Sequence, residues 1–111
     1  MLLENGTIVT STAPTAANPS VEICHETGAY CEAFKRRKNI VASVCLHHAG
    51  HEQFVVLSPC GVCMERLAVH GPEVSVGVPA QGDSTEVSWV PLKQAHPFYW
   101  RKAFSEETPG W

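Results

Sequence analysis

The sequence predicts a single α/β domain in which helices pack on a mixed β-sheet. Three observations lead to this prediction. Apolar, β-branched runs of strand length alternate with two segments of helical periodicity, which gives the order β-β-α-β-β-α-β-β. No internal repeat or low-complexity tract divides the chain. Its 111 residues are about the length that one hydrophobic core requires.

The first twenty residues are predicted to form a hairpin followed by an irregular segment. Asn5-Gly6 is typical of a two-residue type I′ turn, here between short strands at 2–4 and 7–10. The next residues, 11–20, include two prolines and many small side chains, which disfavour regular structure.

A helix is predicted from Cys24 to Lys38. Its apolar positions recur with helical spacing and should form one face: Ala29, Tyr30, Ala33 and Phe34. The four basic residues at 35–38 close the helix, where the negative end of the helix dipole favours cations. We therefore expect this basic run to be solvated rather than to bind phosphate.

The second half of the chain is predicted to alternate between strands and one further helix. The run 40–46 is almost wholly apolar, which is typical of a strand covered on both faces. Further strands are expected at 54–57, 74–78 and 86–90, and a helix at 61–70 that Gly71-Pro72 ends.

Two short segments carry the residues with the strongest chemical potential. Cys60 and Cys63 are separated by two residues at the start of a predicted helix, so both thiols can face one metal ion, and the helix N-terminus favours thiolates there. Cys24 is the best candidate for a third ligand. Glu26, two residues further on, can then reach a water molecule in the open fourth position and act as a proton acceptor and donor. This arrangement favours a catalytic zinc site.

The same two segments resemble the cytidine deaminase family, whose zinc enzymes carry a (His or Cys)-x-Glu element followed by Pro-Cys-x-x-Cys. The resemblance covers about residues 5 to 104 and points to one bacterial branch of the family. It is carried by the stretches CHETGAYCEAFK, NIVASVCLHH, FVVLSPCGVCMERL, GPEVSVGVP and PFYW.

This resemblance implies a three-layer fold with a mixed sheet of about five strands and helices on both faces. As a departure from the family, we expect the N-terminal helix that its relatives carry to be missing. It implies that Cys24, Cys60 and Cys63 bind Zn²⁺, that Glu26 shuttles protons, and that Ser58 and Pro59 line the pocket floor. The implied reaction is hydrolytic deamination of cytidine, deoxycytidine or a related aminated heterocycle with release of ammonia. A place in pyrimidine salvage and a homodimer or homotetramer are implied as well.

The chain departs from the family where the sugar would bind. Family members hold the ribose hydroxyls with an Asn-x-Glu element, and the matching positions are Ala13 and Thr15, with Asn18 the only amide nearby. The family often also has Arg directly after the catalytic Glu, where this chain has Thr27. His25 or Arg66 are the candidates for offsetting the charge of three thiolates on Zn²⁺. A deaminase of another small substrate, such as a nucleoside antibiotic, is therefore an alternative.

Structural interpretations remain for several of these residues. The three cysteines could form a closed, purely structural zinc site with His25 as fourth ligand, in a non-catalytic remnant of the fold, and Glu26 could be an ordinary helix N-terminal acid. We expect Cys31 and Cys45 to be core residues. Solvent-exposed histidines are expected at 47, 48 and 51, and the tail aromatics Phe98, Tyr99 and Trp100 are expected in the core, at an interface or against substrate.

The composition of the chain limits the classes of molecule on which it is expected to act. A formal charge of −3 with eight Lys and Arg cannot supply a broad cationic face, which argues against a nucleic-acid polymer as substrate. No apolar run reaches the length of a membrane span, and the first residues lack the features of a secretory signal. With five cysteines, an odd number, the chain is expected in a reducing compartment, the cytoplasm, acting on a small nucleoside-like molecule.

Overall fold

The protein is described by a computed structural model that covers residues 1–104 and 106–111. Its strands are β1 (Leu2–Leu3), β2 (Ile40–Ser43), β3 (Cys45–His48), β4 (Phe54–Leu57), β5 (Ser75–Ala80) and β6 (Asp83–Pro91). Its α-helices are α1 (Thr27–Lys35), α2 (Gly61–Leu67) and α3 (Leu92–Ala95), with 3-10 turns at Pro19–Val21, Ala68–His70 and Trp100–Phe104.

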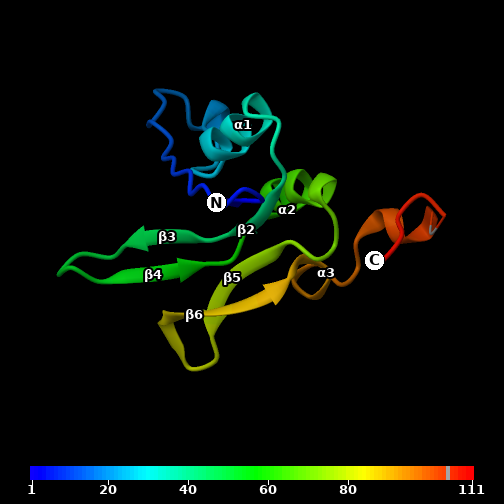
Figure 1. The fold of residues 1–111 in the computed structure, drawn as a ribbon. Coiled ribbons are helices and arrows are strands. Elements are labelled where there is room, and N and C mark those ends of the chain that lie inside the picture. Colours follow the sequence, from blue (N-terminus) through cyan, green and yellow to red (C-terminus); the bar gives the residue numbers. More distant parts are fainter. Residues whose placement is uncertain (105) are drawn as a thin grey trace.

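The strands form a mixed sheet against which helices pack, as the sequence predicts (Figure 1). The main sheet has the order β1-β2-β5-β6, in which β2 and β5 are parallel and the other pairs antiparallel. β3 and β4 pair with each other in an antiparallel hairpin. The strands are thus divided between a four-stranded sheet and a hairpin, whereas the sequence led us to expect one sheet of about five.

The N-terminal hairpin forms, but its turn differs from the predicted one. Gly6 donates a backbone hydrogen bond to Leu3 and Leu3 donates one to Thr7, so three residues make the loop. Gly6 has a φ of 85°, while Asn5 has no positive φ, as a type I′ turn would require. The predicted strand after the turn is reduced to one bridge, between Leu2 and Ile8.

Helix α1 is shorter than the sequence predicts. It begins at Thr27, because the Thr27 amide donates to the Cys24 carbonyl in a turn that precedes the helix. It ends where Arg37 takes a left-handed φ of 54° and the Lys38 amide donates to the Ala33 carbonyl, a common helix stop. Phe34 was expected on the buried face, but its side chain is 84% exposed.

The apolar run at 40–46 was expected to form one strand covered on both faces, and this is wrong. It breaks at Val44 into β2 and β3, and the β3 residue Leu46 is 54% exposed. Val44 packs onto Gly77 of β5. A Cβ atom added at Gly77 would lie only 2.6 Å from the Cγ2 atom of Val44. The break therefore lets the chain leave the main sheet and continue into the β3–β4 hairpin.

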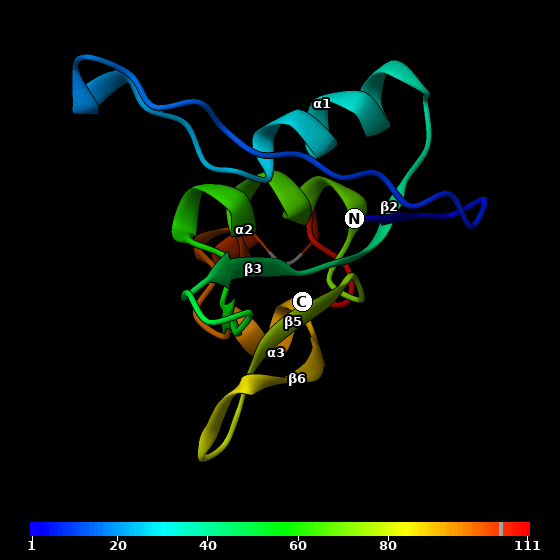
Figure 2. The same ribbon diagram turned by 90° about the vertical axis from the view of Figure 1, so that its left-hand side faces the viewer.

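The core lies between the sheet and the helices α1 and α2, which lie on one side of the strands (Figure 2). Its buried members come from nearly every element: Leu3, Val9, Ala29, Ala33, Ile40, Leu67, Val74, Val76 and Leu92. No helix within residues 1–104 and 106–111 is long and apolar enough to cross a membrane. The N-terminal ends of α1 and α2 are consequently held on the same layer, and this positions the candidate site.

Candidate active site

Three cysteines from two separate segments form a cluster. The sulfur atoms of Cys24, Cys60 and Cys63 all lie within 4.8 Å of one another, and those of Cys24 and Cys60 are 3.3 Å apart. β4 delivers the chain to Cys60, which is the N-cap of α2, and Cys63 lies in the first turn of that helix. Cys24 was expected to open a helix, but it lies in the turn before α1.

The surroundings of the three thiols shift their pKa values in different directions. Burial raises the pKa of the Cys60 thiol, but hydrogen bonds from the amides of Cys63 and Val62 and from the other two thiols outweigh this and lower it overall. Burial raises the pKa of Cys63, with the Glu26 charge acting in the same direction. The hydrogen bond to Cys60 is the largest cause of a raised pKa at Cys24, followed by burial. The amides at the start of α2 thus favour the thiolate form of Cys60.

The donor set fits a zinc ion. Zinc prefers tetrahedral sulfur and nitrogen ligands, and a Zn–S distance of about 2.3 Å implies sulfur atoms about 3.8 Å apart. Three sulfurs within 4.8 Å of one another match this requirement. A closed structural site would need a fourth protein ligand, for which the sequence offers His25. The His25 Nδ1 atom instead accepts a hydrogen bond from the Ala13 amide at 2.8 Å, and His25 is not part of the cluster.

Glu26 lies beside the cluster without joining it. Its half-buried side chain lines a small pocket with Cys63 and Arg66, and its charge raises the pKa values of the nearby thiols of Cys24, Cys45 and Cys63. Glu26 is also the N-cap residue of α1, yet its side chain makes no capping hydrogen bond. The carboxylate is therefore not used as an ordinary helix cap.

Two further residues lie near Glu26: Cys45, which was not assigned to the site from the sequence, and Arg66, which was named there only as a candidate counter-charge. Cys45 was expected in the core, but it is half-buried near Glu26, and burial, then the Glu26 charge, raises the pKa of its thiol to about 11. The Arg66 guanidinium donates to the Thr27 hydroxyl at 2.9 Å and so places a cation next to Glu26. The spacing between the motifs contains no sign of either contact, because both depend on how α2 and β3 pack.

The residues expected to contact substrate have different environments. Ser58 and Pro59 connect β4 to Cys60, directly beside the cluster. The Ala13 amide donates to the ring of His25, the residue that follows Cys24, and Thr15 is exposed. The Asn18 side chain accepts hydrogen bonds from the backbone and hydroxyl of Ser20, at 3.1 and 2.8 Å, and so caps its own 3-10 turn.

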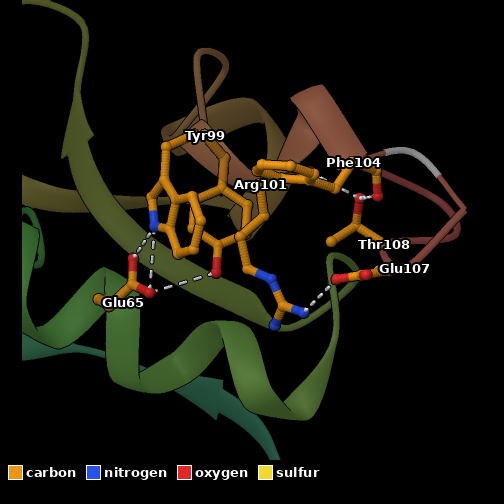
Figure 3. Close-up of polar contacts among 7 residues, drawn as sticks. Glu65, Tyr99, Arg101, Phe104, Glu107 and Thr108 are labelled. Atoms are coloured by element: carbon orange, nitrogen blue, oxygen red, sulfur yellow. Dashed lines mark hydrogen bonds and ion pairs between the residues drawn. The ribbon is translucent and has the colours of Figure 1, made fainter.

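The C-terminal tail packs on α2 (Figure 3). Tyr99 is buried, and its hydroxyl donates to Glu65 at 3.4 Å, while the Trp100 indole donates to the same carboxylate at 3.1 Å. The Thr108 hydroxyl donates to the carbonyls of Arg101 and Phe104, which holds the last turns together. Phe98, in contrast, is 91% exposed.

Of the remaining predictions for cysteines and histidines, one is wrong and the others are confirmed. Cys31 was expected in the core, but it is exposed on α1. His47 and His48 on β3 and His51 in the following loop are exposed as expected, and none belongs to the cluster of possible metal ligands.

The fold and the cluster define an α/β protein in which three cysteines are placed to hold a metal ion and an acidic side chain lies beside them. The cytidine deaminase from Bacillus anthracis is a similar solved structure, with a TM-score of 0.87 and 43% sequence identity over 96% of this chain and 75% of that one. No family model and no curated protein matches the sequence. The identity and coverage show that the chain belongs to the cytidine deaminase family.

Proposed function

We propose that the protein is a zinc-dependent hydrolytic deaminase that converts cytidine, deoxycytidine or a related aminated heterocycle to the keto product and ammonia. One observation carries the proposal: three thiols converge on one point, and the Glu26 carboxylate lies beside them without being one of the ligands. The similarity to a solved cytidine deaminase supports the same chemistry.

In this proposal Cys24, Cys60 and Cys63 hold the zinc ion. The bound metal supplies Lewis acidity, which makes a water molecule acidic enough to act as a nucleophile near neutral pH. Glu26 accepts the proton that this water loses and donates it to N3 of the ring as oxygen adds at C4. A second proton passes through Glu26 to the amino group, the C4–N bond breaks, and ammonia leaves. One water is consumed for each ammonia released.

Arg66 offsets part of the negative charge in this arrangement. Three thiolates with Zn²⁺ leave a net charge of about −1, which a nearby cation stabilises. The contact between Arg66 and the Thr27 hydroxyl supports this role, because it brings the guanidinium to the residue that follows Glu26. The His25 ring is engaged with Ala13 and does not serve as this counter-charge.

The substrate is a small nucleoside-like molecule, with Ser58, Pro59, Ala13 and Thr15 as contacts; Asn18 is the weakest of the proposed contacts because Ser20 occupies its side chain. Ala13 and Thr15 cannot provide the amide and carboxylate with which the family holds a ribose. This favours, as a second candidate, a deaminase of the same chemistry on another small substrate, such as a nucleoside antibiotic.

The test combines zinc analysis with ammonia release from a panel of aminated pyrimidine and purine nucleosides and bases. Zinc-loaded wild type should release ammonia from at least one of them. The Glu26→Gln variant should keep its zinc and its melting temperature but lose about 10²- to 10⁴-fold in turnover, the usual contribution of a general acid–base group. Glu86→Gln, which changes an exposed carboxylate on β6, is the matched control and should retain full activity.

Other outcomes contradict the proposal in different ways. One zinc per chain with no ammonia from any substrate would support a non-catalytic, zinc-stabilised module. Loss of zinc in Glu26→Gln would make Glu26 a ligand rather than a proton shuttle.

We further propose that the protein works as a homodimer or homotetramer in the cytoplasm. Large apolar side chains gather on the β3–β4 hairpin, where Leu46, Phe54 and Leu57 are exposed in the single chain. All five cysteines have free thiols, which supports a reducing compartment.

A further inference from the structure

His25 makes an unusual set of contacts for a residue between a candidate metal ligand and a candidate proton shuttle. Its Nδ1 atom accepts the backbone N–H of Ala13 at 2.8 Å, and the Thr12 hydroxyl donates to the same atom at 3.0 Å. The His25 carbonyl accepts the hydroxyl of Ser11 at 2.6 Å. His25 thus makes hydrogen bonds with three consecutive residues, Ser11, Thr12 and Ala13.

A second, independent contact holds the same segment. Gly28 lies in the first turn of α1, and a Cβ atom built there would come 2.8 Å from the Cβ of Ser11. Only glycine allows so close an approach, although it is a poor helix former. Residues 9–16 have no regular secondary structure. Val9 is held by Met1, and Ala16 donates its amide to Glu22, whereas Ser11–Ala13 between them are held by His25, with Ser11 packed against Gly28.

We propose that His25 is a positioning residue: it clamps Ser11–Ala13 against the start of α1, so that this segment forms one wall of the substrate site. The proposal rests on the proposed function. His25 lies between Cys24 and Glu26 in the chain, so the residue that holds Ser11–Ala13 also connects the candidate ligand to the candidate proton shuttle. Loosening the clamp should weaken substrate binding and leave the metal and the chemical step in place.

The backbone amide of Ala13 provides a readout that does not need catalysis. In His25→Ala its hydrogen exchange should become at least about tenfold faster, because one hydrogen bond of about 1.4 kcal/mol corresponds to a factor of ten. His25→Asn should restore part of the protection, since the amide oxygen lies close to the position of Nδ1 and can accept the same N–H. His47→Ala, at an exposed histidine on β3, is the matched control and should change nothing.

Kinetics then test the link to substrate. In His25→Ala, KM should rise about tenfold with kcat within about threefold and one zinc per chain retained. Gly28→Ala should raise KM in the same direction without touching the imidazole, because its methyl group displaces Ser11. Binding of the substrate to each variant in a Glu26→Gln background, measured by calorimetry, should weaken by the same factors.

Unchanged exchange at the Ala13 amide in His25→Ala would overturn the clamp. A fall in kcat at constant KM, or loss of zinc, would overturn the assignment to substrate binding. Inactivity of the wild-type protein on every substrate would instead contradict the proposed function, and the exchange rate of Ala13 would still decide whether the clamp exists.

Discussion

Individual residues of the same type have very different environments in this protein, and the cysteines show it best. Cys60 is the N-cap of α2, and backbone amides help to lower the pKa of its thiol. Burial raises the pKa of Cys63, three residues later. Cys45 is half-buried near Glu26, and Cys31 is exposed. Only thiols that lie close together in the folded chain can bind the same ion. The position of a cysteine in the fold, rather than its residue type, therefore decides whether it can belong to the site.

Replacing Cys60 with alanine should abolish metal binding and lower the thermal stability of the zinc-loaded protein. Metal affinity is coupled to folding, and two remaining sulfurs cannot hold zinc tightly. Cys31→Ala is the control and should bind one zinc per chain with an unchanged melting temperature. Zinc analysis and thermal melts with and without a chelator measure both. Full zinc content and activity in Cys60→Ala would remove the metal assignment.

At the level of elements, the parallel pair β2–β5 depends on a close approach. Gly77 of β5 is buried beneath Val44, the residue at which β2 gives way to β3. The same contact that anchors the sheet therefore directs the chain into the hairpin whose second strand leads to Cys60.

Gly77→Ala should destabilise the protein by about 1–3 kcal/mol, because the new methyl group would overlap Val44 Cγ2 in a packed core. Val44→Ala in the same chain removes Cγ2 and should restore stability. The recovery should be only partial, because Val87 Cγ2 also lies 3.0 Å from the position of the new methyl group. Chemical denaturation of the single and double variants measures the coupling. Equal stability of Gly77→Ala and wild type would show that the approach is not tight.

The junction between α2 and β2 should respond to pH through His70. Burial lowers the pKa of His70 despite the nearby Glu4, and its Nδ1 atom accepts the Ile40 amide at 3.3 Å. Because the folded protein holds this proton less readily than the unfolded chain, unfolding takes up a proton between the lowered pKa and the usual value near 6.5. Acidification through that window should therefore lower the free energy of unfolding.

Thermal melts between about pH 7.5 and pH 5.5 would measure this. The decline should be smaller in His70→Gln, which does not titrate there, than in wild type. A His51→Gln control in the exposed hairpin loop should follow wild type. Identical slopes for His70→Gln and wild type would remove His70 as the cause.

For the whole molecule, the single chain leaves much apolar surface uncovered. Core formation uses small and medium side chains from the sheet, α1 and α2, while Leu46, Phe54 and Leu57 on the β3–β4 hairpin face solvent. A patch of this kind is typical of an interface. These exposed side chains make the hairpin the surface on which the proposed homo-oligomer would form.

Light scattering coupled to gel filtration should accordingly give a dimer or tetramer for wild type. The double variant Leu46→Lys and Phe54→Lys should shift the mass toward that of one chain, because charges desolvated in an apolar interface are costly. Lys substitution at Val69, an exposed apolar residue away from the hairpin, is the control. A monomeric wild type would contradict the oligomer.

The sequence by itself determined the α/β class, the β4 boundaries and the cluster with its neighbouring acid, because these depend on local patterns: apolar strand runs, a Cys-x-x-Cys pair at a helix start, and a carboxylate two residues after a cysteine. Tertiary structure decided the rest. The break at Val44, the contact between Arg66 and Thr27, and the clamp on Ala13 each join residues far apart in the chain. Such contacts depend on how elements pack against one another, which no local pattern encodes.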